Sequence, residues 1–351
     1  MVERRSALRA CASLMLIAAA ATSIVVGAPR VSDAQSVRDL FKKVTPSVVV
    51  IRAKGRDVTS GGQIGFTETG SGVLISKDGK VMTAAHVVHS MDTISVEFLG
   101  GETVSARVIS SEPAADLSLL QLDRVPPGAV ASPMADSTTV QVGDEIIIVG
   151  APYGLSYSLS VGYISARWAP NTVYKTMPLA EFFQTDATIN TGNSGGPMFG
   201  MNGEVVGIVS HNISKGGGSE GLGFVVTINT AKQLLLTKKS FWSGLEGVVL
   251  SDRVADILNL PNRASGFIVK TVAKDSPGDQ IGLRGSTMIA SIAGQEVPLG
   301  GDIIMSVNGI SAASANIAKI RDSMNTLPPG GTFKVSILRA GQILELTGKA
   351  P

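Results

Sequence analysis

Residues 192–197 read Gly-Asn-Ser-Gly-Gly-Pro and lie between two strand-like stretches. A serine between glycines sits where the backbone can turn sharply and bring its N–H groups close to a substrate oxygen, as an oxyanion hole requires. Taken alone, the G-x-S-x-G pattern is equally typical of an ordinary glycine-rich turn. The rest of the chain decides between these two interpretations.

Two further residues give the serine a catalytic context. His86 lies within Thr-Ala-Ala-His-Val-Val at the end of a strand-like stretch, and Asp116 comes just before an apolar run. With Ser194, the order along the chain is His, Asp, Ser. An α/β-hydrolase would run Ser, acid, His, and no alternating helix–strand pattern follows the serine. The histidine-first order among β-rich segments favours a double β-barrel serine protease.

Short strand-like stretches recur along the first two thirds of the chain, separated mostly by turn-forming residues. They are 46–52, 71–76, 80–83, 93–98, 104–109, 117–122, 145–150, 159–165, 204–210 and 222–228. The dipeptides Asp78-Gly79 and Asn202-Gly203 are typical of tight hairpin turns, which need positive φ. Such a pattern predicts barrels or sandwiches. Residues 228–240 have helical spacing and predict a helix that closes the first domain.

Composition excludes several classes of protein. The chain has 351 residues, which suits two domains, and its 44% apolar content supports sizeable cores. A net charge of +2 excludes nucleic-acid binding driven by a strongly basic surface. One cysteine excludes a disulfide framework, and with three histidines it almost excludes a Cys/His zinc site. No metal or organic cofactor is expected.

Residues 1–34 predict a secretory signal peptide. Arginines precede an uncharged stretch at 10–27, and small residues at Ser32 and Ala34 fit cleavage after Ala34. The alternative is an uncleaved membrane anchor, because the uncharged stretch is just long enough to span a bilayer. Cleavage predicts a periplasmic or secreted protein. Retention predicts an inner-membrane anchor with the protein facing the periplasm, and only then a membrane contact.

These motifs resemble those of the HtrA (Deg) family of trypsin-like serine proteases. The matching stretches are TAAHVV (83–88), DLSLL (116–120), QTDATINTGNSGGP (184–197), GEVVGI (203–208) and GLGF (221–224). The resemblance runs over residues 36–349. It predicts an all-β double β-barrel, chymotrypsin-like protease domain over residues 36–240.

The resemblance implies a role for each catalytic residue. His86 is expected to be the general base, Asp116 to orient and support it, and Ser194 to be the nucleophile. The backbone N–H groups of Gly192 and Ser194, with Asn193 between them, are expected to hold the oxyanion.

Thr188 bears on specificity, since proteases of this fold place the base of the primary pocket about six residues before the serine. Thr188 lacks the acid that cleavage after Lys or Arg needs, and Asp186 comes two residues too early. We therefore expect cleavage after small aliphatic residues, with an extended substrate pairing along residues 209–211. The expected substrate-binding residues are Thr188, Ile189, Val209, Ser210, His211, Leu222, Gly223 and Phe224. The remaining histidine, His89, is expected to be an exposed loop residue.

Residues 242–349 predict a small α+β domain. Its expected strands are 247–250, 266–272, 302–307, 332–338 and 342–347, and its expected helices are 252–258 and 314–326. The stretch Ser243-Gly244-Leu245 resembles the carboxylate-binding loop of a PDZ domain, which implies binding of C-terminal peptides by strand addition. Ile317, Ile320 and Met324 are expected to line the pocket, or to form an ordinary core stripe.

An apolar insertion at about 286–299 departs from the PDZ pattern. It is expected to turn a small hairpin and to cover part of the peptide groove or contact a neighbour. The segment 53–69 is shorter than the loop by which some family members reach another subunit, which argues against large cages. A homotrimer is the family's basic unit, with Phe41 as a candidate contact.

The leading functional hypothesis is an exported, ATP-independent serine endopeptidase that degrades unfolded or damaged envelope proteins. One alternative is a latent peptide-binding chaperone or scaffold. Another is a site-specific signalling protease that cuts a membrane partner, which an uncleaved anchor would favour. No nucleic-acid partner is expected.

Overall fold

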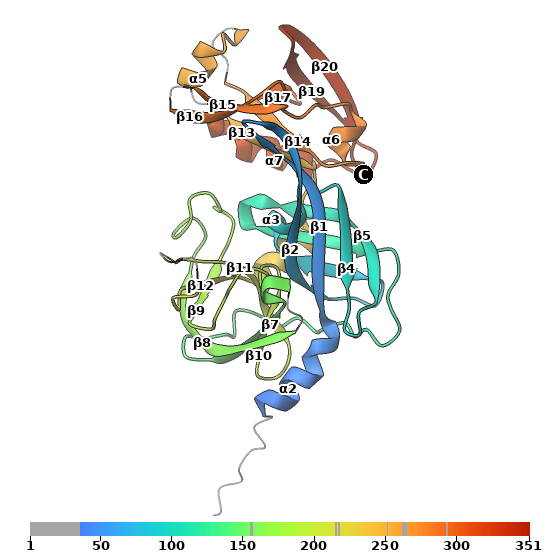
Figure 1. Cartoon of the computed structure of the whole chain (residues 1–351), viewed down its shortest axis with the longest axis vertical. Coiled ribbons are helices and arrows are strands. Elements are labelled where there is room, and N and C mark those ends of the chain that lie inside the picture. Colours follow the sequence, from blue (N-terminus) through green and yellow to red (C-terminus); the bar gives the residue numbers. More distant parts are fainter. Residues whose placement is uncertain are drawn as a thin grey trace, which may run out of the picture. The chain divides into compact units, whose positions relative to one another are not determined.

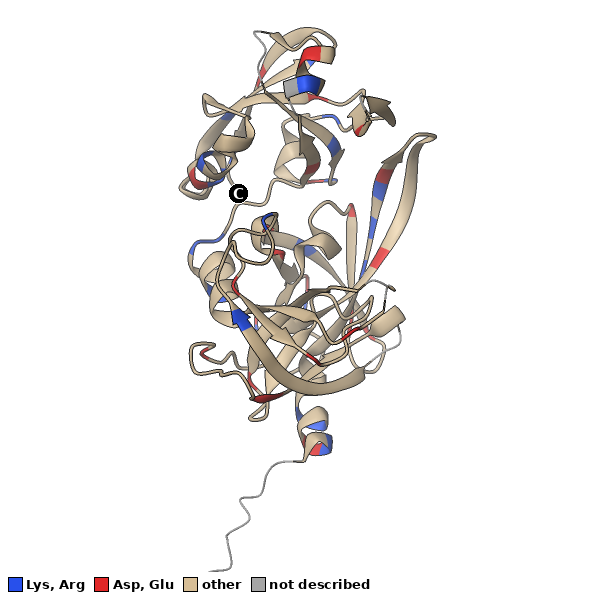
Figure 2. Cartoon of the chain, turned by 90° about the vertical axis from the view of Figure 1, so that its left-hand side faces the viewer, with Lys and Arg blue, Asp and Glu red and all other residues tan. Residues whose placement is uncertain are grey.

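The computed structural model describes residues 36–351, except 155–156, 215, 217, 251, 262–264 and 293. The predicted signal peptide over residues 1–34 therefore lies outside the described residues. Within the described ranges, no helix has the length and apolarity needed to cross a membrane. Acidic and basic residues are interspersed along the ribbon (Figure 2), in keeping with the near-neutral charge.

The N-terminal half of residues 36–240 is a closed barrel with strand order β1-β2-β3-β6-β5-β4 (Figure 1). Its strands are β1 (Val48–Thr59), β2 (Gly62–Leu74), β3 (Lys80–Thr83), β4 (Thr93–Glu97), β5 (Thr103–Glu112) and β6 (Leu117–Leu122). Helix α2 (Val37–Val44) and the short helix η1 (Thr45–Ser47) precede β1. Two short helices, α3 (Ala85–Val88) and η2 (Pro113–Ala115), follow β3 and β5.

The second half is another closed barrel, with order β10-β11-β12-β9-β8-β7. Its strands are β7 (Glu145–Gly150), β8 (Ser158–Trp168), β9 (Phe182–Thr185), β10 (Pro197–Gly200), β11 (Val205–Asn212) and β12 (Gly223–Thr227), with the short helix η3 (Pro152–Gly154) after β7. The helix predicted over 228–240 is present as α4 (Ile228–Ala231) followed by a π-helical turn, η4 (Lys232–Thr237).

One apolar core joins the two barrels. It contains Met82 and Leu117 of the first barrel and Ile147 and Phe182 of the second, together with Leu40 of α2. Alternate side chains of a strand point to one face, so each short β-branched run supplies inward residues to a barrel. The two barrels confirm the predicted chymotrypsin-like fold. The interface between them is where loops from both halves meet.

The C-terminal domain is built on a sheet with order β13-β14-β17-β19-β20, with β18 pairing β17. The strands are β13 (Leu245–Val249), β14 (Phe267–Val272), β17 (Ile303–Val307), β18 (Ile310–Ser311), β19 (Thr332–Arg339) and β20 (Gln342–Lys349). The helices are α5 (Asp252–Ile257), α6 (Pro277–Gln280), η6 (Ser314–Asn316) and α7 (Ile317–Asn325). The domain is α+β, as predicted.

The insertion forms the expected hairpin, β15 (Met288–Ile292) and β16 (Gln295–Leu299). Val297 of this hairpin packs with Leu250, Val254 of α5 and Ile268 in a separate apolar cluster. No described residue of the insertion lines the cavity beside β13 and α7. The expectation that the hairpin covers the groove is therefore wrong, because its apolar side packs against α5.

The segment 53–69 is not a short loop. It extends β1 and β2 as one long hairpin, paired up to Thr59 and Gly62. Asp57 of this hairpin forms an ion pair of 2.7 Å with Lys270, and Gln63 Nε2 donates to the carbonyl of Ser286 at 2.8 Å. The hairpin thus contacts the C-terminal domain of its own chain.

Candidate active site

His86 and Asp116 meet at the junction of the barrels. His86 lies on α3, and its Nδ1 is 2.9 Å from Oδ1 and 3.0 Å from Oδ2 of Asp116. The backbone N–H of His86 also donates to Oδ1, at 3.1 Å. Asp116 follows η2 in the left-handed region, with φ of 53°. A carboxylate only accepts hydrogen bonds, so Nδ1 carries the proton and Nε2 is left as the basic nitrogen.

The electrostatics of this pair favour a carboxylate beside a basic imidazole. Burial opposes ionisation of Asp116, but the hydrogen bonds from His86 and Ser210 and the charge of His86 outweigh it, so the pKa of Asp116 is lowered. Removal from water disfavours protonation of His86. The hydrogen bond and charge of Asp116 outweigh that effect, and the pKa of His86 is raised. The pair is therefore suited to accept a proton on Nε2.

Ser194 lies in the turn before β10. Its hydroxyl donates to the carbonyl of Ser210 at 3.2 Å, and its own carbonyl accepts from the N–H of Ser71 at 2.8 Å. The described hydrogen bonds include none between Ser194 Oγ and His86 Nε2. Such catalytic bonds often form only with substrate in place. The structure thus places the hydroxyl beside β11, at the same junction as the His86–Asp116 pair.

The turn depends on glycines with positive φ. Gly192 has φ of 99°, and a Cβ there would lie 2.3 Å from the carbonyl oxygen of Ala151. Gly195 has φ of 81°, and a Cβ there would lie 2.1 Å from Thr83 Oγ1. Only glycine fits such a close approach at this backbone geometry. The two glycines thus allow the turn to pack closely against Thr83 of the first barrel and Ala151 of the second.

The N–H groups of this turn fall into two sets. The N–H of Asn193 donates to the carbonyl of Asn190 at 3.0 Å and is not free. The carbonyl of Thr191 accepts from the N–H of Tyr153 at 2.8 Å. The Gly192 N–H of the same trans peptide therefore points the opposite way. Among the described hydrogen bonds, the N–H groups of Gly192 and Ser194 have no acceptor. These two donors can serve an oxyanion.

The expected substrate strand lies along β11. Both backbone groups of Val209 already hold the turn, since its N–H donates to Gly196 at 2.9 Å and its carbonyl accepts from Gly195 at 2.7 Å. The segment after Val209 remains for substrate pairing, and it contains Ser210 and His211. His211 packs edge-on against Tyr174 and stacks on Phe224, with ring centroids 4.2 Å and 5.5 Å away.

The residues expected to form the primary specificity pocket differ in burial. Ile189, Gly223 and Phe224 are buried, whereas Thr188 and Leu222 are exposed. A Cβ on Gly223 would lie 2.6 Å from Ile189 Cδ1, so these two residues touch. The carboxylate of Asp186 accepts from the N–H of Tyr163 at 2.7 Å. That acid is therefore occupied at β8.

Comparisons with known proteins place the chain in a family. Residues 70–208 match the trypsin-like peptidase domain. The periplasmic pH-dependent serine endoprotease DegQ of Escherichia coli K12 is 31% identical over 335 residues, covering 89% of this chain and 69% of DegQ. The chain belongs to the HtrA family of serine proteases.

Other HtrA proteins agree with this assignment. A probable periplasmic DegP-like serine endoprotease of Hahella chejuensis is 33% identical over 270 residues, covering 73% of this chain and 55% of that protein. The chain thus spans between about half and two thirds of these curated relatives. The solved structure of the HtrA-type protease AlgW with a decapeptide covers 90% of this chain and 98% of its own, at 25% identity and a TM-score of 0.52.

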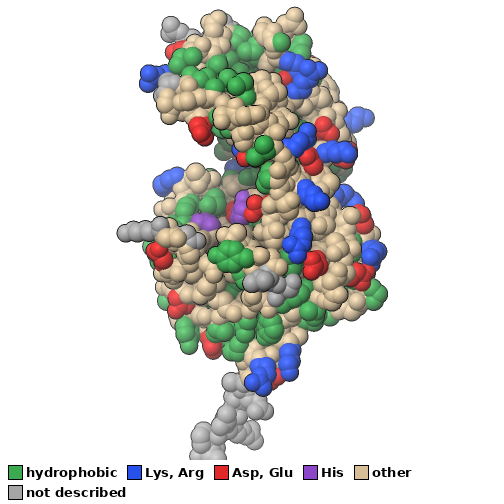
Figure 3. All heavy atoms as spheres, viewed as in Figure 1, with side chains coloured by type: hydrophobic (Ala, Val, Ile, Leu, Met, Phe, Trp, Pro, Cys, Tyr) green, Lys and Arg blue, Asp and Glu red, His purple; other side chains and the backbone are tan. Residues whose placement is uncertain are grey.

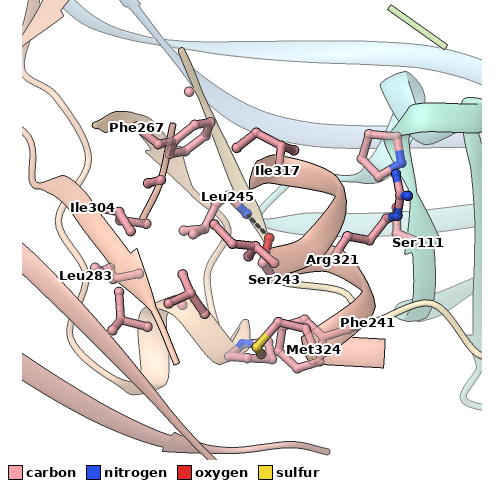
Figure 4. A pocket seen from close by; sticks show the side chains of 18 of the residues that line it. Ser111, Phe241, Ser243, Leu245, Phe267, Leu283, Ile304, Ile317, Arg321 and Met324 are labelled. Atoms are coloured by element: carbon pink, nitrogen blue, oxygen red, sulfur yellow. Dashed lines mark hydrogen bonds between the residues drawn. The ribbon is translucent and has the colours of Figure 1, made fainter. Parts of the chain in front are cut away.

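An apolar cavity of about 480 Å³ lies in this HtrA protein where the C-terminal domain meets the first barrel, and His89 and residues 111–114 of that barrel form part of its lining. Figure 4 shows Ile317 projecting from α7 toward Leu245 of β13 and Phe267 of β14, whereas Arg321 points to the other side, toward Ser111 of β5. Four predicted groove residues besides Leu245 also line it: Ser243, Ile317, Ile320 and Met324. Gly244 lies in the adjoining loop at φ of 73°. Strand β13 is at the edge of the sheet, so a further strand can add to it.

His89 is not the exposed loop residue predicted from the sequence. Its Nδ1 lies 2.7 Å from Ser111 Oγ and its Nε2 lies 3.1 Å from the carbonyl oxygen of Leu245. Trp242 Nε1 donates to the His89 carbonyl at 2.8 Å. Burial lowers the pKa of His89 to about 4. The prediction was wrong because these partners come from the C-terminal domain and from β5.

Charged residues join the same two domains beside the cavity. Arg321 Nε of α7 lies 3.8 Å from Glu112 Oε2, at the end of β5, and the Glu112 side chain is 5% exposed. Ser240 Oγ donates to the same carboxylate at 3.2 Å. Within the described part of the chain, no group of three or more His, Cys, Asp or Glu side chains is arranged to hold a metal ion.

Proposed function

We propose that this protein is a serine endopeptidase in which His86 is the general base, Asp116 orients it and Ser194 is the nucleophile. The observation that carries the proposal is the His86–Asp116 pair, which leaves Nε2 as the free basic nitrogen beside the Ser194 turn. The known activity of the curated relatives, named as serine endoproteases, supports it.

The mechanism follows from this geometry. When substrate binds, the Ser194 hydroxyl turns from the Ser210 carbonyl to His86 Nε2 and attacks the scissile carbonyl carbon as its proton passes to Nε2. Asp116 stabilises the imidazolium, and the N–H groups of Gly192 and Ser194 receive the oxyanion. The imidazolium then protonates the leaving amine. Water attacks the acyl-enzyme by the same steps in reverse and frees Ser194.

The proposed substrates are unfolded or damaged proteins of the periplasm, cut after small aliphatic residues. The buried contact of Ile189 with Gly223 supports an apolar pocket, and Asp186 is held at β8. The periplasmic names of the relatives support the location. Main-chain pairing along β11 suits unfolded chains, because it does not depend on substrate sequence.

The C-terminal domain is proposed to be a PDZ domain that binds C-terminal peptides. The apolar cavity between β13 and α7 supports this, as does the position of β13 at the edge of the sheet. We further propose a homotrimer in which Phe41, packed against the shared barrel core, contributes to the contact.

A latent form is the second candidate function, in which the chain acts as a peptide-binding chaperone or scaffold until activated. The observation that favours it is the hydrogen bond that the Ser194 hydroxyl donates to the carbonyl of Ser210, which directs the hydroxyl proton away from a general base. An intact His86–Asp116 pair is compatible with such a resting state.

Turnover of unfolded β-casein by the purified chain tests the proposal, with cleavage sites mapped by mass spectrometry. Wild type is expected to cut after small aliphatic residues, and Ser194→Ala to lose roughly 10³-fold or more in rate. Ser291→Ala, on the exposed part of β15, is the matched control and should keep full activity. If wild type fails to cut even with hydrophobic C-terminal peptides added, the chaperone hypothesis replaces the protease hypothesis.

A further inference from the structure

We propose that His211 is a positioning residue that acts on Asp116 through the hydroxyl of Ser210. The proposal rests on the protease function above and extends its catalytic machinery by one residue. His211 was expected from the sequence only to line the substrate cleft. Its contacts instead connect it to the carboxylate that orients the general base.

A β-bulge makes the contact between neighbours possible. Adjacent residues of a regular strand point to opposite faces, but the pairing of β11 with β12 shifts register between Val209 and His211. His211 Nδ1 consequently lies 2.9 Å from Ser210 Oγ. The same Ser210 hydroxyl donates to Asp116 Oδ2. The three groups form one connected chain of hydrogen bonds.

The direction of each hydrogen bond follows from the acid at its end. The pKa of Asp116 is lowered, so the group is a carboxylate and can only accept. The Ser210 proton must therefore point to Asp116. Ser210 Oγ is then an acceptor, and His211 Nδ1 must carry a proton and donate it. This assigns the Nδ1–H tautomer to His211.

The surroundings of His211 keep the ring neutral and fixed. It lies among the rings of Tyr174, Phe182 and Phe224. Burial lowers the pKa of His211 to about 4, the nearby Asp116 charge raises it and His86 lowers it. The other ionisable group packed against the ring is the Tyr174 phenol, whose pKa burial raises to about 12. The ring is therefore neutral above about pH 4, and its Nδ1–H remains available to Ser210.

The consequence lies in how Asp116 is held. One of its oxygens takes the backbone N–H of His86, and the other takes the Ser210 hydroxyl. A donor behind Ser210 polarises that hydroxyl and strengthens its bond to the carboxylate. The carboxylate stays turned toward His86 Nδ1. Without that donor, Asp116 becomes more basic and holds the imidazolium proton more tightly.

A matched pair of variants tests this role. His211→Leu keeps apolar bulk and removes the donor. His211→Asn loses much of the ring but places an amide N–H where Nδ1 stands. The probe is phenylmethylsulfonyl fluoride, which modifies an activated serine without occupying an extended cleft. Its second-order rate of inactivation is measured against pH, alongside kcat and KM on a casein-derived peptide.

The expected result separates positioning from packing. His211→Leu should slow inactivation about fivefold, which corresponds to the free energy of one neutral hydrogen bond. It should also move the acid limb of the pH–rate profile, where the rate falls as the general base is protonated, to higher pH. His211→Asn should restore the wild-type limb, with any loss confined to KM. If Leu leaves rate and limb unchanged, or if Asn loses as much as Leu, the positioning role is refuted.

A second measurement does not depend on catalysis. Nitrogen shifts of the three histidine rings in ¹⁵N-histidine-labelled protein, assigned with single variants, report each tautomer. His211 is expected to carry its proton on Nδ1, and Ser210→Ala to perturb that signal. A proton on Nε2 would overturn the proposal even in an active enzyme. Conversely, a wild type that neither cleaves casein nor reacts with the sulfonyl fluoride refutes the proposed function, whatever the tautomer.

Discussion

Asp116 sets the proton affinity of His86 at the scale of single residues. The imidazole side chain is 45% exposed, and the carboxylate beside it is 9% exposed. Figure 3 shows histidine side chains, in purple, surfacing in a hollow of the molecule beside hydrophobic groups. Water can reach Nε2 while Nδ1 is held. A base in this position is neutral, and so active, only above its own pKa.

The acid limb of activity follows from this pair. Because the pKa of His86 is raised from 6.5, kcat/KM should fall as pH drops through a value above 6.5. Asp116→Asn removes the raising charge, so its limb should move to lower pH while kcat falls about 10⁴-fold. A pH profile of kcat/KM on a peptide substrate checks both effects. Asp123→Asn, at an exposed acid, is the control, and a wild-type limb below pH 6.5 would contradict the argument.

The residues proposed to be catalytic could be predicted from the sequence because their signals are local. Glycines around Ser194 and the motif around His86 are each confined to a few neighbouring positions. His89 has no such signal, since its partner Leu245 is 156 residues away. The contact of His211 with Ser210 was also not predicted, because it depends on a β-bulge that no residue in β11 indicates. Sequence motifs therefore predict the residues proposed to react better than the residues that contact and orient them.

The turn at 190–196 is the element that carries both the proposed nucleophile, Ser194, and the proposed oxyanion donors. Gly192→Ala should lower kcat/KM by about 100-fold or more, because its Cβ would meet the Ala151 carbonyl at 2.3 Å and displace the N–H donor. Gly100→Ala is the matched control, with φ of 96° and open space around it. Both variants carry the cost of positive φ, about 1 kcal/mol. Equal activity in the two, at comparable melting temperatures, would exclude a special role for the turn.

Some secondary-structure elements could not be predicted from the sequence, or were predicted only in part. Strands β9 and β10 were not predicted; each has four residues, and β10 begins with Pro197 and ends with Gly200, which are residues typical of turns. A helix was predicted over 228–240 and is present, but the spacing of its apolar residues does not indicate a π-helical turn. Residues 53–69 were not assigned to strands from the sequence, although they extend β1 and β2 as one long hairpin. Contacts with Lys270 and Ser286 stabilise this hairpin.

At the scale of the whole molecule, hydrogen bonds connect the C-terminal domain to the segment that follows α3, the helix that carries His86. His89 follows α3, which carries His86, and contacts Leu245 at the start of β13. A carbonyl only accepts, so His89 Nε2 donates to Leu245 and Nδ1 accepts from the Ser111 hydroxyl. Glu112 and Arg321 add an ion pair beside these hydrogen bonds. The two domains should therefore unfold as one coupled unit.

This coupling has a pH dependence that one substitution isolates. The pKa of His89 is about 4 when folded and 6.5 in the unfolded chain. Its neutral form thus contributes stability above pH 6.5 that is lost as pH falls from 6.5 toward 4. His89→Leu removes both hydrogen bonds and this titration, so the variant should melt at lower temperature near pH 7.5 and in two transitions.

The difference between the two proteins should then shrink as pH approaches 4, because protonated His89 can no longer accept from Ser111. Calorimetry at several pH values between 7.5 and 4.5 measures the gap in melting temperature. The other buried histidine, His211, titrates in both proteins and cancels in that difference. A gap that stays constant with pH would mean that His89 holds the domains together by shape alone, since the protonation of His89 is the titration that the variant lacks.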